Sequence, residues 1–117
     1  MSYTNAIVVS WDRAVPGREA NAAEHFQEFA SYLGELQRDG TVDAFEPVFL
    51  NAHGGGLNGF FLIKGKGERL ATVQLSDRWN EHVTRAMVNM AGFSAIGAGC
   101  GDAVGARMEL WQKWSAK

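Results

Sequence analysis

The sequence predicts an α+β fold in which four antiparallel strands form one sheet and helices cover one of its faces. Segments with strand and helix periodicity alternate along the chain. Each of the two longer helical segments carries a single apolar stripe, as expected of a helix packed on a sheet. Right-handed crossovers would place both of these helices on the same face.

The first predicted strand, within residues 6–13, has apolar side chains on both faces. Ile7, Val9 and Trp11 would point to one face of an extended chain, and Val8 to the other. A strand of this kind is typical of the middle of a sheet that is covered on both sides. We therefore expect a second layer on each face.

A long helix is predicted from Pro16 to about Arg38. Proline suits the first turn of a helix, and Gly40 is placed to end the helix in a left-handed conformation. The apolar residues recur at spacings of three and four, and they are Ala22, Phe26, Phe29, Leu33 and Leu36. This stripe would pack on the sheet.

Residues 42–50 and 58–64 are predicted to form a hairpin around a glycine-rich loop. Pro47 has no backbone N–H, so its strand belongs at the edge of the sheet. The loop glycines connect two strands and do not precede a helix, so they do not form a phosphate loop.

A short helix is predicted over 68–75, and Ser76 can cap a second one that runs to about Met90. A fourth strand is expected over 93–98. Asp102 can cap a last helix with apolar residues at helical spacing, namely Val104, Met108, Trp111 and Trp114. The alternation of Ala106, Met108 and Leu110 would also suit a strand.

The resulting order of elements is that of a ferredoxin-like fold. Its strand order is 4-1-3-2 or the mirror image, with the first strand central and the strand of Pro47 at an edge. The face of the sheet without helices would expose more Val, Ile and Phe than a monomer normally shows. We therefore expect a homodimer formed through this face.

Length and composition indicate one domain, residues 1–117, that folds. The formal charge of −2 without a long basic run argues against nucleic acid as a partner. No apolar stretch reaches the roughly 20 residues that cross a bilayer, so no membrane association is expected. Residues 1–5 lack the basic start of a signal peptide, and Cys100 is the single cysteine, so a cytoplasmic location is predicted.

Three parts of the chain resemble the dimeric α+β barrel proteins, in which two ferredoxin-like subunits pack sheet against sheet. They are Val15-Pro16-Gly17-Arg18-Glu19 before a long helix, the hairpin ending at Gly65, and Ser76-Asp77-Arg78-Trp79-Asn80-Glu81-His82 leading to Ala91-Gly92-Phe93. The group includes cofactor-free monooxygenases of the antibiotic-biosynthesis type, haem-degrading enzymes, muconolactone isomerase-like proteins and stress-responsive barrels. The resemblance implies the fold and does not choose among these activities.

In the monooxygenase-like members of this group, a histidine on the helix after the third strand often lines a pocket, and His82 is similar in placement. Because imidazole carries protons near neutral pH, His82 is the candidate catalytic residue. His25 lies at the edge of the apolar stripe of the first helix. The alternative for each of the two is a solvated residue on the flank of its helix.

Three further residues are candidate ligand-binding residues. Trp11 and Trp79 could supply apolar walls, and Asn89 lies on the flank of its helix two turns after His82. Packing in the core or in a dimer interface is the alternative for Trp11. His53 is expected to be exposed in the hairpin loop.

No metal or cofactor is required by the sequence. The three histidines lie on separate elements without a pair at i and i+4, which argues against a zinc site. Haem needs only one axial histidine, so the sequence does not exclude haem binding. Cys100 is predicted to be a small buried thiol in a strand, since no neighbouring cation or base would activate it.

These observations predict a protein that binds a small apolar or aromatic molecule between helices and sheet. One alternative is a cofactor-free monooxygenase or isomerase acting on an aromatic or lactone substrate. The other is a non-catalytic dimer whose core is filled by its own side chains.

Overall fold

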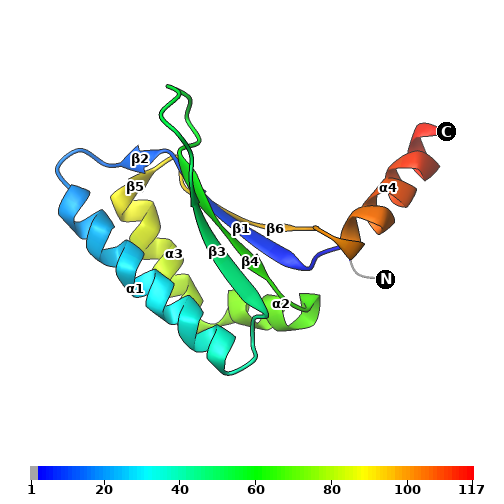
Figure 1. The fold of residues 1–117 in the computed structure, drawn as a ribbon, viewed down its shortest axis with the longest axis horizontal. Helices are drawn as coiled ribbons and strands as arrows, with labels where there is room; N and C mark the ends of the chain where they lie inside the picture. The colour runs from blue at the N-terminus through cyan, green and yellow to red at the C-terminus, as the bar shows by residue number, and fades with distance from the viewer. Residues whose placement is uncertain (1–2) are drawn as a thin grey trace.

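The computed structural model describes residues 3–117, and its elements follow the predicted order (Figure 1). The main strands are β1 (Ala6–Trp11), β3 (Ala44–Phe49), β4 (Gly59–Lys64) and β6 (Ser94–Ala98). The helices are α1 (Glu19–Arg38), α2 (Gly67–Leu75), α3 (Asp77–Asn89) and α4 (Asp102–Ser115). Met1 and Ser2, the start of the segment compared with a signal peptide, lie outside the described residues.

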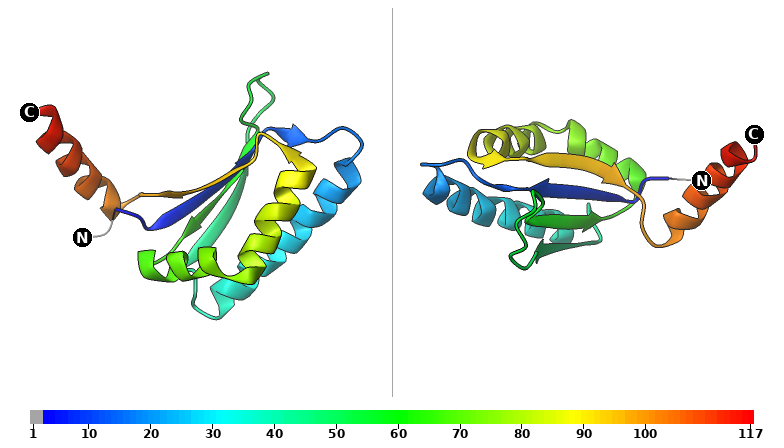
Figure 2. Two further views of the ribbon diagram at one scale, coloured as in Figure 1. Left: turned by 180° about the vertical axis from the view of Figure 1, so that it is seen from behind. Right: turned by 90° about the horizontal axis from the view of Figure 1, so that it is seen from above.

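The four main strands form one antiparallel sheet in the order β3-β4-β1-β6, which is the predicted order 4-1-3-2 read from the opposite edge and confirms it. β1 is central, and it pairs with β4 on one side and β6 on the other. α1 and α3 lie side by side on one face of the sheet (Figures 1 and 2). The two-residue strands β2 (Arg13–Ala14) and β5 (Met90–Ala91), which were not predicted, pair with each other.

The core lies between this sheet and the two long helices. Ile7 and Val9 of β1 and Phe61 and Ile63 of β4 point to the helices and are buried. They pack against the apolar stripe of α1 and the buried faces of α2 and α3, which contribute Phe29, Tyr32, Leu33, Leu70, Val73 and Trp79. The predicted stripe of α1 is therefore its packing face.

Three local predictions need correction. α1 begins at Glu19, because Gly17 has a φ of 87° and continues the turn; Gly40, with a φ of 83°, ends the helix as predicted. Asp102 is the first residue of α4 and does not cap it through its side chain. Cys100 is half-buried and follows β6, where its backbone is bound by the side chain of Asn5.

The other face of the sheet is not covered by any element of residues 3–117 (Figure 2). Val8 lies in the middle of this face, paired with Leu62 on one side and Ile96 on the other. Ile96 is 61% exposed. The uncovered apolar row is the feature from which the sequence predicted a dimer.

α4 is helical, as favoured over the strand alternative, but it extends away from the sheet (Figure 1). Ala103 and Ala106 near its start are buried, whereas Met108, Trp111 and Trp114 are exposed. None of the helices within residues 3–117 combines the length and the apolar character needed to cross a bilayer.

Pro47→Val is expected to fold with little loss of stability. β3 is an edge strand, and the Leu50 N–H donates to the Asn58 carbonyl at 3.0 Å. Because hydrogen-bonded and outward-facing residues alternate along an antiparallel edge, the nitrogen of Pro47 faces away from β4. The free energy of unfolding in urea should therefore stay within roughly 0.5 kcal/mol of wild type, the usual range of surface substitutions. A loss of several kcal/mol would contradict the outward orientation of this nitrogen.

Candidate functional site

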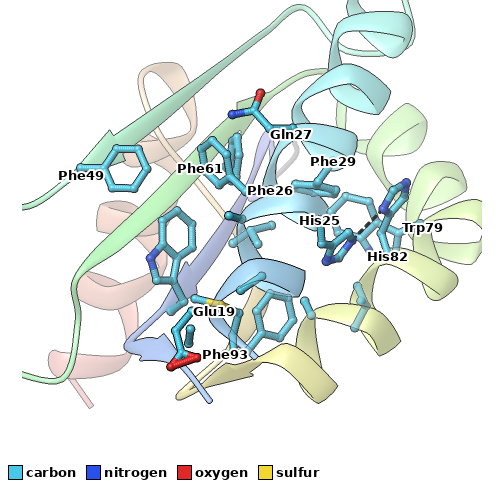
Figure 3. Close-up of a pocket in the computed structure, with 18 residues that line it drawn as sticks. Glu19, His25, Phe26, Gln27, Phe29, Phe49, Phe61, Trp79, His82 and Phe93 are labelled. Atoms are coloured by element: carbon cyan, nitrogen blue, oxygen red, sulfur yellow. Dashed lines mark hydrogen bonds between the residues drawn. The ribbon is translucent and has the colours of Figure 1, made fainter. Parts of the chain in front are cut away.

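A pocket of about 510 Å³ opens between the sheet and the helices α1 and α3 (Figure 3). Its walls are mostly apolar. The lining side chains with an ionisable or amide group are Glu19, His25, Gln27 and His82. The pocket therefore combines a large apolar surface with a few polar groups, as ligand sites commonly do.

Aromatic rings form the wall of the pocket on the side of the sheet. Trp11 lies at the end of β1, with ring centroids 6.1 Å from Phe26, 5.9 Å from Phe49 and 5.8 Å from Phe61. Gly59 is paired with Trp11 across the sheet, and any side chain at position 59 would collide with the indole. Glycine at this position therefore leaves room for the tryptophan in the pocket wall.

The wall on the side of the helices carries a hydrogen-bonded pair of histidines. His25 Nε2 lies 3.0 Å from His82 Nδ1, and the two ring planes are within 5° of parallel. One nitrogen must donate and the other accept, so the two rings share one proton between them. The sequence singled out each histidine separately but did not predict the pair.

The two rings differ in exposure. His25 is only 5% exposed, so the solvated alternative is wrong for this residue. His82 is half-buried, with its ring stacked at 4.7 Å on Tyr32. The guanidinium of Arg78 covers Tyr32 at 4.6 Å from its ring centroid. His82 therefore lies between the pocket on one side and Tyr32 with Arg78 on the other.

Burial keeps both imidazoles neutral at neutral pH. It lowers the pKa of His25 to about 4, with a smaller effect in the same direction from the charge of Arg85. Burial also lowers the pKa of His82, again with help from Arg85 and Arg78. The carboxylates of Glu28 and Glu81 offset these effects only in part.

Stability should therefore fall as the pH drops from about 6.5 to about 4. In this window the unfolded chain protonates His25 and the folded chain does not, so protons favour unfolding by up to about 3 kcal/mol, and the loss ends below the folded pKa. The free energy of unfolding in urea at several pH values measures the effect. His25→Gln should reduce the dependence, leaving the part that comes from His82, whereas His53→Gln in the exposed loop should keep all of it. A wild-type protein equally stable across the window would contradict the burial of His25.

Glu19 places a negative charge at the rim of the pocket. Its carboxylate accepts a hydrogen bond from the Gly17 N–H at 3.1 Å, which lowers its pKa. None of the described lining residues is Lys or Arg. The electrostatics of the pocket therefore disfavour an anionic ligand.

The structure brings Trp11, Trp79 and His82 together in the pocket but leaves Asn89 outside it. Asn89 is 6% exposed, and its side-chain oxygen accepts a hydrogen bond from Arg18 Nε at 2.8 Å. It lines a separate hollow beside Arg18. The shared flank of α3 was not sufficient to place it near His82.

Within residues 3–117, no group of three or more His, Cys, Asp or Glu side chains converges in a way that could hold a metal ion. The His25–His82 pair supplies two imidazoles only. The chemistry that the pocket residues themselves can perform is binding and proton transfer.

The sequence matches no family model and no curated protein. Several solved structures are similar in fold. A dimeric protein of unknown function from Bacteroides fragilis, described as ferredoxin-like, has a TM-score of 0.61 at 6% identity and covers 85% of this chain and 98% of its own. The chain has a ferredoxin-like fold.

Two other similar structures agree with this fold. An ethyl tert-butyl ether d (EthD) family protein from Bacillus halodurans has a TM-score of 0.60 at 10% identity, over 84% of this chain and 99% of its own. An antibiotic-biosynthesis-monooxygenase-like protein from Caulobacter crescentus has a TM-score of 0.58 at 12% identity, over 86% and 93%. The fold implied by the resemblance in the sequence is thus confirmed. Sequence identities this low do not show that the proteins share an activity.

Proposed function

We propose that this protein binds a small, uncharged, apolar molecule in the pocket and that His82 takes part in a proton transfer to or from it. The observation that carries the proposal is the His25–His82 pair in the wall of an otherwise apolar cavity. Two neutral, hydrogen-bonded imidazoles beside a bound apolar substrate are suited to general acid–base chemistry.

The pocket supports a ligand of limited size and without charge. Its volume of about 510 Å³ falls within the range of roughly 300–1,000 Å³ typical of small-molecule sites. The rings of Trp11, Phe26 and Phe61 suit the face or edge of a flat ring. The carboxylate of Glu19 at the rim favours a neutral molecule over an anion.

A cofactor-free monooxygenase or isomerase is the second candidate. The similar Caulobacter crescentus structure is the observation in its favour. An oxygenase would consume dissolved oxygen together with its substrate, and an isomerase would not. Oxygen uptake measured with an electrode, with aromatic and lactone compounds as test substrates, separates the two.

We also propose that the protein is a homodimer formed through the uncovered face of the sheet. The apolar row of Leu62, Val8 and Ile96 supports this arrangement, as does the dimeric state named for the similar Bacteroides fragilis protein. A non-catalytic interaction dimer is the alternative. It would bind no small molecule in the pocket.

Binding of Nile red, an uncharged apolar dye, tests the proposed pocket. Wild type should enhance the fluorescence of the dye. Ala22→Trp, which places a large ring in the pocket lining, should weaken binding at least tenfold. Ala20→Trp, on the exposed side of the same helix, should bind the dye as wild type does. Absence of binding by wild type, or binding unchanged in a folded Ala22→Trp variant, would overturn the proposal.

A further inference from the structure

We propose that His25 and His82 form a proton relay in which His25 meets the ligand and His82 exchanges protons with water. The relay rests on the proposed function, because it needs a neutral weak acid bound in the pocket. It assigns the first contact to His25, which the sequence placed at the edge of the apolar stripe of the first helix, with a solvated flank position as the alternative.

The hydrogen bond between the rings fixes which nitrogens lie inside the relay and which lie at its two ends. It uses His25 Nε2 and His82 Nδ1, which leaves His25 Nδ1 and His82 Nε2 as the outer nitrogens. Within residues 3–117, neither outer nitrogen has a hydrogen-bonding partner, and no buried side-chain nitrogen or oxygen lacks one. Both outer nitrogens must therefore be reachable by a water-sized molecule.

Burial indicates which end faces the ligand. His25 and His82 both line the pocket, but His25 is only 5% exposed, and we therefore assign its outer nitrogen to the cavity end of the relay. His82 is half-buried and lies farther from the aromatic wall (Figure 3). The path of the proton therefore leads from the cavity through His25 to His82 and then to solvent.

The three proton transfers of the relay occur together, so that atoms balance and neither ring gains a charge. The ligand X–H gives its proton to His25 Nδ1, the proton on His25 Nε2 passes to His82 Nδ1, and the proton on His82 Nε2 leaves to water. The ligand becomes X⁻, one proton enters the solvent, and both imidazoles stay neutral with their tautomers exchanged. The reverse sequence returns a solvent proton to the ligand and restores the first tautomers.

The surroundings of the pair favour a relay over a single base that holds the proton. Cations flank the pair, with Arg85 and Arg78 on α3, and the carboxylates of Glu28 on α1 and Glu81 on α3 compensate only in part. An imidazolium would be both desolvated and repelled. Passing the proton onward avoids forming an imidazolium, and the anion X⁻, which the pocket disfavours, exists only until the reverse sequence returns a proton to it.

The relay is tested with β-tetralone, a neutral bicyclic ketone with acidic C–H bonds, in heavy water. Wild type should accelerate hydrogen–deuterium exchange beside the carbonyl, measured by NMR. His25→Gln and His82→Gln should each lower this acceleration by roughly 10²- to 10⁴-fold, because glutamine hydrogen-bonds but does not carry a proton at neutral pH. His53→Gln, in the exposed loop, should exchange as wild type does.

The outcomes separate the relay from the proposed function. Displacement of Nile red by β-tetralone reports binding in every variant. Exchange that survives in His25→Gln, or binding by wild type without faster exchange, overturns the relay and leaves the binding pocket standing. Failure of wild type to bind overturns the proposed function itself.

A second measurement does not depend on variants that fold. In wild type with isotope-labelled histidines, NMR should show coupling between His25 Nε2 and His82 Nδ1 across their hydrogen bond, with both rings neutral at neutral pH. Two imidazoles that titrate independently at the ordinary histidine pKa would contradict the shared proton.

Discussion

A Val8→Asp protein is expected to sediment as a monomer or to fail to fold, whereas wild type is expected to sediment as a dimer. Val8 lies between Leu62 and Ile96 on the face of the sheet opposite α1 and α3. In the proposed dimer this row is covered by the partner's sheet, so an aspartate here would be a buried, unpaired charge. The cost of such a charge is several kcal/mol, enough to prevent association.

Analytical ultracentrifugation at micromolar concentration measures this effect. Val88→Asp is the matched control, because Val88 is 52% exposed on α3, away from the sheet face. It should remain dimeric. A wild-type chain that sediments at its monomer mass of 12.8 kDa would contradict the dimer, and so would a Val8→Asp variant that stays dimeric.

Replacing His82 is expected to have the second large effect. His82→Ala should lower proton exchange on a bound carbon acid by roughly 10²- to 10⁴-fold, the usual contribution of a positioned acid or base. It should also destabilise the fold by about 1–3 kcal/mol, because it leaves the inner nitrogen of buried His25 without its partner. His82→Gln keeps an acceptor for His25 and should recover most of this stability without recovering exchange.

This contrast distinguishes a chemical role from a structural one. Exchange rates with β-tetralone and urea unfolding, measured on the same preparations, give both quantities. A purely structural His82 would lose exchange only in proportion to the unfolded fraction, and glutamine would then restore both. Full recovery of exchange in His82→Gln would therefore contradict proton transfer by this residue.

Much of the fold could be predicted because local periodicity determines it. Apolar residues on both faces of β1 indicated its central place, and Pro47 indicated an edge strand. The position of α4 could not be predicted in this way. The spacing of Met108, Trp111 and Trp114 predicts a helix, but it does not say what lies against that helix.

The positions of some candidate site residues could be predicted for the same reason. Trp11 and His82 were placed in the pocket because strand alternation and the helical period orient them. The contact between His25 and His82 depends on how closely α1 packs against α3, which neither helix encodes alone. Asn89 lies on the same flank of α3 as His82, but its side chain is hydrogen-bonded to Arg18 in a separate hollow.

A crystal structure of the protein soaked with β-tetralone tests the central claim most directly. We expect ligand density in the pocket, with the ring system against Trp11 and Phe61 and the carbonyl end directed at His25. A structure at saturating ligand in which side chains fill the pocket, or in which the ligand binds elsewhere, would contradict it.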